Sequence, residues 1–382
     1  MRILLGHTFP DRTDFGSSWI EDWLARLRSA GIEVYPFSLV LDHRRPVIYF
    51  NELNFLWRYR DRRLLTMYQT LANTLLEYEV FICFNGANVH PEFVRGLECF
   101  TVYGCFDDPE SSAKLSKPVA AAFDMAMVGN IAEIDAYRSW GVKNVRWWPL
   151  GFRQDDYDSS LTGQGILDGH RDIEVALLCE RVTRYRKNRV DQFVRAFPDG
   201  AYYGQGWPSG FLPERQRIPL LQRTRIGINI HNSTGPINFR TFYLPANGVM
   251  QICDNKSHLG QVFDLGVEAI GYDSIEEAIE LTRYYLAHDD ERRRIAAAGW
   301  KRAISDYNEV ACFKKVVDAI KEVKSSINDK ECRQETVVVF EENDRFLRRL
   351  GIRAILAIWS GLNALVLKMR AVIRKVLSSI FR

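Results

Sequence analysis

The sequence lacks the cysteine spacing that marks a disulfide framework or a zinc site. Its 382 residues include seven cysteines, which are scattered along the chain and never form a C-x-x-C pair. An odd number of dispersed cysteines is typical of reduced thiols. No group of His, Asp and Glu has metal-ligand spacing either. We therefore expect neither a metal site nor a bound cofactor.

Long hydrophobic runs are also missing. The uncharged stretch 354–367 has 14 residues, fewer than the roughly 18–20 that span a bilayer. The apolar run Ile3 to Leu5 is followed at once by Gly6 and His7, so it does not form a signal peptide. These absences favour a cytoplasmic protein.

Acidic residues are absent after Asp344, where nine basic residues occur. The remaining chain has 42 basic against 48 acidic residues, a net charge of −6. An acidic body argues against a nucleic-acid partner. On a helix, residues 345–382 place most large apolar side chains on one face and most basic ones on the other. This pattern predicts an amphipathic helix on an anionic membrane surface, with a partner-binding or dimerisation helix as the alternative.

Strands and helices alternate along the rest of the chain. Short apolar runs such as Arg2 to Leu5 and Ile32 to Phe37 are separated by a helical pattern and a glycine. This order predicts an α/β fold of two doubly wound, Rossmann-like domains that face a cleft. The expected domains are 1–152 and 172–323, with linkers at 153–171 and 324–344 and the helical tail at 345–382.

The stretch 226–254 reads as strand, polar loop, helix and strand. Asn238 is a good N-cap residue, and Gly248 is a typical stop for the helix. In such units, ligands bind at the carboxyl ends of strands, and helix N-termini favour phosphates. A cation at Arg240, in the first helical turn, opposes the helix dipole unless an anion lies beside it. The stretch therefore predicts a phosphate site.

This stretch also resembles a known family. The pattern Asn238-x-Arg240-x-Phe242-x-x-x-Ala246-x-Gly248, preceded by Ile228-Asn229-Ile230-His231, is similar to the donor-binding segment of CgeB-like glycosyltransferases. The resemblance implies the two-domain glycosyltransferase-B fold and a nucleotide-sugar donor. The family usually has Glu where this chain has Tyr243.

Further donor contacts follow from the loops and from the resemblance. His231 ends a strand at the polar loop, Arg186 matches a frequent arginine of the family, and Gly204 belongs to a Tyr-Gly-x-Gly-Trp segment that is common in it. Each has a structural alternative: a satisfied core histidine, a solvated charge cluster and a surface turn. The expected donor-binding residues are Arg186, Gly204, His231, Asn232, Ser233, Asn238, Arg240, Phe242 and Tyr243.

An acidic run, Asp107-Asp108-Pro109-Glu110, ends a strand of the first domain. A carboxylate at a strand end can act as a general base on an acceptor hydroxyl, and CgeB-like chains often have a similar acidic pair here. The alternative is a turn in which Asp caps a helix. Asp14 and His7, near the first strand, are weaker candidates for the same catalytic role.

Asp156-Tyr157-Asp158 has the D-x-D form of a metal signature, but it falls in the expected linker. We interpret it as a chance match, so transfer is expected to need no metal. The expected function is transfer of a sugar from a nucleotide-sugar to a hydroxyl acceptor, lipid-linked or saccharide, in surface polysaccharide or glycoconjugate assembly. The enzyme would attach peripherally to the inner face of the membrane. A catalytically degenerate scaffold protein, suggested by Tyr243, and a sugar-nucleotide epimerase of the same shape are the alternatives.

Overall fold

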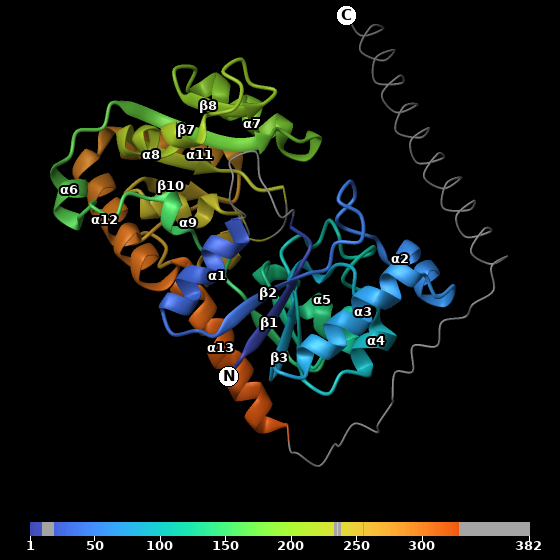
Figure 1. Ribbon diagram of the computed structural model, residues 1–382. Helices are drawn as coiled ribbons and strands as arrows, with labels where there is room; N and C mark the ends of the chain where they lie inside the picture. Colours follow the sequence, from blue (N-terminus) through green and yellow to red (C-terminus); the bar gives the residue numbers. More distant parts are fainter. Residues whose placement is uncertain (10–18, 233–234, 236–237, 255, 328–382) are drawn as a thin grey trace, which may run out of the picture.

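The computed structural model describes residues 1–9, 19–232, 235, 238–254 and 256–327. These residues form two parallel α/β domains joined by a linker (Figure 1), which confirms the expected fold class. Three expectations fall outside the described residues: the roles of Asp14 and Ser233, and the tail 345–382. No helix in the described ranges is long and apolar enough to cross a membrane.

The first domain is built on a six-stranded sheet in which all neighbouring strands are parallel. The strands lie in the order β2-β1-β3-β4-β5-β6. Most are continuous apolar runs because helices cover both faces of a parallel sheet. Their bounds are β1 Ile3–His7, β2 Val34–Ser38, β3 Val80–Cys83, β4 Phe100–Cys105, β5 Met125–Val128 and β6 Val145–Trp147.

Two hydrophobic clusters flank this sheet. Along β1, Leu4 faces one cluster while Ile3 and Leu5 face the other, as the two-residue period of a strand requires. The first cluster is covered by α2 (Phe50–Arg58), α3 (Arg62–Leu75), α4 (Pro91–Arg95) and α5 (Ile134–Ser139). The second is covered by α1 (Trp19–Ser29) and α13 (Glu309–Ser326).

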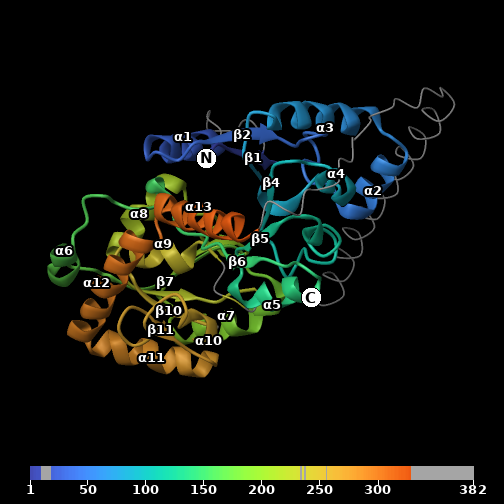
Figure 2. The same ribbon diagram turned by 90° about the horizontal axis from the view of Figure 1, so that it is seen from below.

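Helix α13 comes after the second domain in the chain but packs on the first. It lies beside α1 in both ribbon views (Figures 1 and 2). Its apolar side, which includes Phe313 and Val316, is buried against the first sheet, and the Phe313 ring lies 5.6 Å from that of Trp23. Glu309, at its start, forms an ion pair with Arg26 of α1 at 2.5 Å. The helix therefore fastens the two domains together.

The second domain has a five-stranded parallel sheet in the order β11-β10-β9-β7-β8. Its strands are β7 Ile173–Arg181, β8 Ala201–Gln205, β9 Thr224–Asn229, β10 Met250–Cys253 and β11 Ile270–Gly271. Its helices are α7 Arg184–Ala196, α8 Glu214–Arg223, α9 Arg240–Ala246, α10 Lys256–Leu259, α11 Ile275–Ala287 and α12 Asp289–Asp306. Helix α6 (Gly163–Asp168), in the expected linker, packs on α12.

Both sheets have a point at which the strand order reverses. In the first sheet the chain moves from β1 to β2 on one side and then to β3 on the other. In the second sheet it moves in the same way from β7 to β8 and then to β9. Ligands of such folds bind at this switch point, outside the carboxyl ends of the strands. The loops after β7 and β9 are therefore where a ligand is expected in the second domain.

Candidate functional site

Arg240 lies at the start of α9, next to the carboxyl ends of β7 and β9. Its side chain is 9% exposed. Its Nη1 donates to the Leu178 carbonyl oxygen at 2.8 Å, and its Nε donates to Asn229 Oδ1 at 3.0 Å. These two bonds hold the guanidinium between the two strands. The arginine predicted from the loop pattern is thus built into the switch point.

Arg186, in the first turn of α7, is a second buried arginine at this point. Its two terminal nitrogens donate to the carbonyl oxygens of Ile230, at 2.8 Å, and Arg181, at 2.5 Å. Its buried Nε has no hydrogen-bond partner. Burial, together with the positive charge of Arg240, lowers the pKa of Arg186 to about 10. The two guanidinium groups thus lie close enough to repel each other in a poorly solvated place.

Asn229 ties the start of the following loop to its end. Its Oδ1 accepts from Arg240 Nε and from Asn238 Nδ2, the latter at 2.9 Å, and its Nδ2 donates to Thr241 Oγ1 at 3.1 Å. Asn238 Oδ1 accepts from the Thr241 main-chain nitrogen at 3.2 Å. The prediction that Asn238 is the N-cap was wrong, because the N-cap of the seven-residue helix α9 is Phe239, whose side chain makes no capping bond. Asn238 instead bonds to the first turn from one position earlier.

His231, two residues after β9, is buried and paired with Asp254, which directly follows β10. Its Nδ1 lies 2.5 Å from one Asp254 oxygen, and its main-chain nitrogen donates to the other at 2.8 Å. Arg189 Nη1 contacts the same carboxylate at 3.1 Å. Burial lowers the pKa of His231 although Asp254 opposes this effect. His231 thus fits the alternative of a satisfied core histidine that supports the loop from below.

His231, Cys253 and Asp254 bring three possible metal-ligating atoms within 4.8 Å of one another. The donor set does not suit a metal. Burial, and then the Asp254 charge, raises the pKa of the Cys253 thiol well above its usual value. Both Asp254 oxygens are already bonded to His231 or Arg189. The group is a hydrogen-bonded cluster under the loop.

The loop after His231 reaches the first domain. Asn232 is exposed, and its Oδ1 accepts from the Thr183 hydroxyl at 2.5 Å. Gly235 is buried, and a Cβ on it would lie 1.8 Å from Asn130 Oδ1. Asn130 follows β5 of the first sheet. Gly235 therefore lies against the first domain, at a point where only glycine fits.

Three other expected donor contacts have clear structural surroundings. Gly204, the second-last residue of β8, has φ +137°, and a Cβ there would lie 1.6 Å from the Cys179 carbonyl oxygen. Phe242 and Tyr243 are buried in the hydrophobic cluster beneath α9. Burial raises the pKa of Tyr243 to about 12. Close packing and burial account for Gly204, Phe242 and Tyr243 at these positions. Their contact with a donor stays a prediction.

The acidic run at the end of β4 divides into an exposed and a buried carboxylate. Asp107 is exposed and accepts from Asn85 Nδ2 at 2.7 Å. Asp108 is buried and accepts from the Tyr137 hydroxyl at 2.7 Å, and its other oxygen has no partner. His7 is 4% exposed, and its ring stacks on Phe9 at 6.0 Å. Of the described candidates, Asp107 is the one a solvent-borne hydroxyl can reach.

The D-x-D acids are engaged elsewhere. Asp156 is buried in ion pairs with Arg153 and Arg217, at 3.1 and 2.6 Å. Asp158 accepts from the Ser160 main-chain nitrogen and from Gln222. Both carboxylates thus hold the linker against its neighbours.

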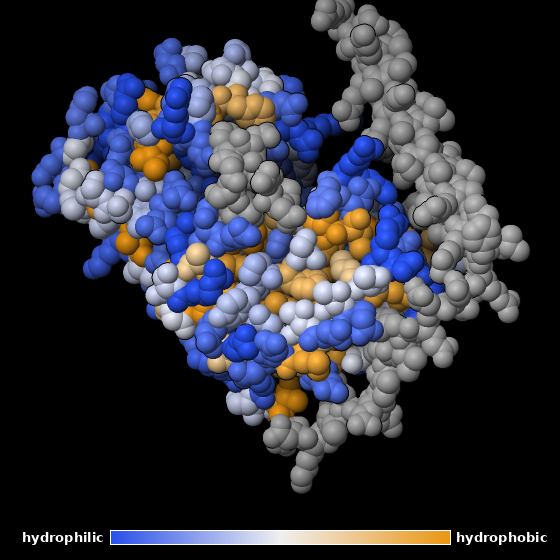
Figure 3. All heavy atoms as spheres, viewed as in Figure 1, coloured by the Kyte–Doolittle hydropathy of each residue, from blue (hydrophilic) through white to orange (hydrophobic). Residues whose placement is uncertain are grey.

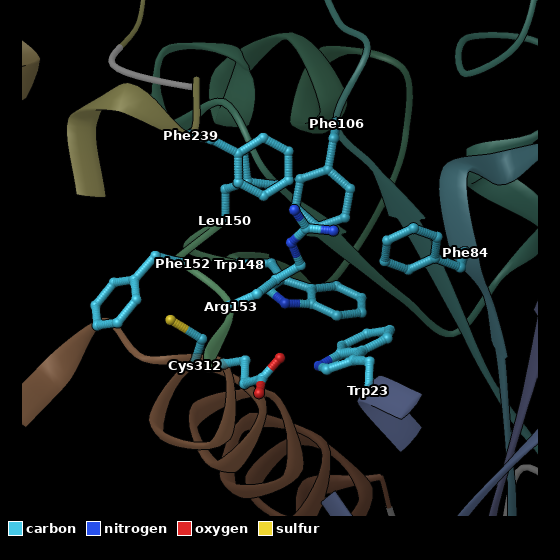
Figure 4. A pocket seen from close by; sticks show the side chains of 10 residues that line it. Trp23, Phe84, Phe106, Trp148, Leu150, Phe152, Arg153, Phe239 and Cys312 are labelled. Carbon is cyan, nitrogen blue, oxygen red and sulfur yellow. The ribbon is translucent and has the colours of Figure 1, made fainter. Parts of the chain in front are cut away.

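An aromatic pocket lies between the two domains (Figure 4). Phe84 follows β3, Phe106 follows β4 and Trp148 follows β6, and their rings lie 5.1 to 5.5 Å from one another. Trp23 of α1 completes this wall at 5.8 Å from Phe84. Phe239, directly before Arg240, faces it from the second domain.

Sequence reasoning missed the supporting residues. It singled out Arg240 and His231 but not Asn229 or Asp254, which hold them. The available signal was a polar residue at the end of each of two apolar strands. The aromatic pocket was not predicted from the sequence either, because only acidic residues at strand ends were considered as candidates in the first domain.

Comparisons with known proteins agree with this fold. Residues 181–318 match a family described as glycosyl transferase-like. No curated protein sequence matches the chain. The match does not extend to the narrower CgeB-like resemblance, which stays a prediction.

Solved structures share the fold at low identity. HepE of Anabaena in complex with UDP-glucose has a TM-score of 0.52 and 13% identity, covering 86% of this chain and 100% of that one. Sucrose-phosphate synthase of Thermosynechococcus elongatus has a TM-score of 0.56 and 12% identity, covering 85% and 99%. A trehalose-6-phosphate synthase has a TM-score of 0.52 and 10% identity, covering 84% and 99%. Residues 181–318 are therefore a glycosyl transferase-like region, within a chain that has the two-domain glycosyltransferase-B fold.

Proposed function

We propose that the protein transfers a sugar from a nucleotide-sugar to a hydroxyl acceptor. The observation that carries this proposal is the pair of buried arginines, Arg186 and Arg240, at the switch point of the second sheet. The positive charge of Arg189, which pairs with Asp254 at 3.1 Å, also acts on Arg186. A diphosphate would offset this positive charge and supply acceptors for arginine N–H groups that the protein's own bonds leave over.

The donor side is thus assigned to the loops after β7 and β9. The fold neighbour HepE was solved with UDP-glucose, which supports a nucleotide-sugar as the donor here. Arginines that neutralise a leaving diphosphate take the part that a metal ion has in other enzymes. We therefore expect transfer without a metal or other cofactor, persisting in excess chelator.

The acceptor side is assigned to the first domain. Asp107 lies at the carboxyl end of β4, is exposed, and is oriented by Asn85. It would take the proton of the acceptor hydroxyl as general base. The acceptor would be lipid-linked, or a saccharide, in surface polysaccharide or glycoconjugate assembly, and the basic tail 345–382 would hold the enzyme peripherally at the inner face of the membrane.

The proposal is tested by nucleotide binding to Arg240→Ala. Calorimetry with a panel of nucleoside diphosphates, UDP included, should show binding to the wild type. Loss of a charged hydrogen bond should weaken it by about 1.5–3 kcal/mol, roughly 10- to 150-fold. Arg215→Ala, which removes an exposed arginine of α8, is the matched control and should bind as the wild type does.

Thermal unfolding of Arg240→Ala must show that the domain is still folded. Unchanged affinity in a folded variant would remove Arg240 from the donor site. Product analysis then separates the alternatives: transfer supports the proposal, a changed free sugar nucleotide indicates an epimerase, and binding without turnover indicates a degenerate scaffold.

A further inference from the structure

We infer that the aromatic pocket between the domains binds an apolar part of the acceptor, a hydrocarbon or aromatic group attached to the hydroxyl that receives the sugar. This inference rests on the proposed function and assigns the acceptor a place and a chemistry. The pocket combines rings from the first domain with Phe239 of the second and the start of α13. It exists only where the two domains meet, as a site for group transfer between them requires.

Apart from the indole N–H groups of Trp23 and Trp148, the lining offers few polar partners to a ligand. Its two charged residues, Arg153 and Glu309, are committed to other contacts. Arg153 is bonded to Asp156 at 3.1 Å, and Glu309 is bonded to Arg26 at 2.5 Å. A sugar in this pocket would bury hydroxyl groups without hydrogen bonds, which is costly. An apolar group would instead gain from removing its own surface and the rings from water.

The pocket is adjacent to both halves of the proposed reaction site. Phe106 immediately precedes Asp107, and Phe84 immediately precedes Asn85, which bonds to Asp107. On the other side, Phe239 immediately precedes Arg240. An apolar group among the rings would therefore hold its attached hydroxyl near Asp107 and facing the donor side.

The size of the pocket limits what enters. Its cavity volume is about 50 Å³, well below the roughly 300–1,000 Å³ of sites for drug-sized molecules. The pocket thus takes one segment of an acceptor, with the remainder of the molecule outside.

The test uses alkyl glucosides as probes, because they vary the apolar part while the polar head stays constant. Methyl, butyl and octyl β-glucoside, each below its micelle concentration, are titrated into the full-length protein without any donor. Every methylene that the pocket buries should tighten binding about three- to fourfold. Equal affinity for methyl and octyl β-glucoside would overturn the inference.

Two pocket variants and one control locate the binding. Phe239→Ser and Phe106→Ser should each weaken octyl β-glucoside binding at least fivefold and leave methyl β-glucoside binding unchanged. Phe239 is 46% exposed, so its variant should fold even if Phe106→Ser does not. The control Phe211→Ser removes a phenylalanine that is 62% exposed and lies outside the pocket, and it should change neither affinity. An equal loss in the control, or none in a folded pocket variant, would contradict the assignment.

The outcome is separable from that of the proposed function. If nucleotides bind but the alkyl chain has no effect, this inference alone fails. If the chain length matters but no nucleotide binds and no transfer occurs, the pocket binds apolar ligands, and its acceptor role falls with the proposed function.

Discussion

The His231 imidazole and the Asp254 carboxylate form a buried pair whose charge states depend on pH. Burial lowers the pKa of His231, so the ring is neutral near pH 7. Burial alone would raise the pKa of Asp254, but His231 and Arg189 hold it below its usual value, so the carboxylate is charged. Both pKa shifts make the free energy of unfolding larger at neutral pH than in acid.

This pair predicts a loss of stability as the pH falls. Below a pH of about 6.5, the unfolded chain protonates His231 while the folded chain resists it. The free energy of unfolding should then fall by up to about 1.4 kcal/mol per pH unit from this residue. Urea unfolding of the wild type and of His231→Asn, measured between pH 8 and 5, isolates its contribution.

A second buried histidine, His90, also lowers the stability in acid, so its contribution must be subtracted. Burial lowers the pKa of His90 to about 4, so the wild-type profile contains both residues. The difference between wild type and His231→Asn removes the His90 contribution. His43→Asn, at an exposed position, should leave the profile unchanged. Parallel profiles for wild type and His231→Asn would show that the buried pair has no such effect.

Substitutions of Asp107 and Asp108 should have different effects although the two residues are adjacent in sequence. Asp107→Asn should lower transfer by 10²–10⁴-fold, the usual worth of a general base, while stability and nucleotide binding stay unchanged. Asp108→Ala leaves the buried Tyr137 hydroxyl without its acceptor and should lower stability by about 1–3 kcal/mol. Kinetics and urea unfolding of both variants, with Glu110→Gln as an exposed control, would decide. The reverse pattern would make Asp108 the reacting carboxylate.

At the scale of elements, the packing of β8 against β7 requires glycine at position 204. This strand approaches β7 so closely that a Cβ at Gly204 would overlap the Cys179 carbonyl oxygen, and its φ of +137° also excludes other residues. Gly210 ends the same loop at φ +64° with no atom within 4 Å of a Cβ. A side chain at Gly210 would therefore cause backbone strain alone, whereas one at Gly204 would cause strain and steric overlap.

Substitution of these glycines should have unequal costs. Gly210→Ala should destabilise the protein by about 1–2 kcal/mol, the cost of a left-handed residue. Gly204→Ala should cost more, because β7 and β8 must also move apart. Urea unfolding of both variants measures the difference. Equal losses would show that overlap with Cys179 is relieved without strain.

The whole molecule is held in one arrangement by contacts that cross between its domains. Helix α13 returns to the first sheet, Gly235 meets Asn130, and the aromatic pocket draws on both domains. On the face seen in Figure 3, hydrophilic residues dominate over the second domain, whereas hydrophobic residues gather over the first.

The basic tail, residues 345–382, predicts that the full-length protein binds anionic membranes. A variant ending at residue 327 should fold and bind nucleotide as the full chain does. It should lose sedimentation with anionic liposomes, since each basic residue near such a surface contributes about 1 kcal/mol. Salt should weaken the binding of the full chain without abolishing it, because the apolar face is not screened. If the full chain ignores these liposomes at low salt, a partner-binding helix is the better account.

The sequence by itself determined the fold class and the place of the loops at the switch point of the second sheet. Short apolar runs separated by amphipathic patterns specify parallel α/β units because local burial sets the period of each element. Arg240 was predictable as well, since a cation in the first turn of a helix conflicts with the dipole unless an anion is present.

Only the tertiary structure decided which of these residues belong together. Arg186 and Arg240 are 54 positions apart, yet the switch point places them side by side. The same packing buries His231 and Asp108 and leaves Asp107 exposed, although all three end apolar strands. The aromatic pocket collects rings from elements between Trp23 and Phe239, each of which reads in the sequence as an ordinary core residue. Sequence patterns report burial along one element, whereas a site depends on which strand ends become neighbours, and that is set by the order of strands in the sheet.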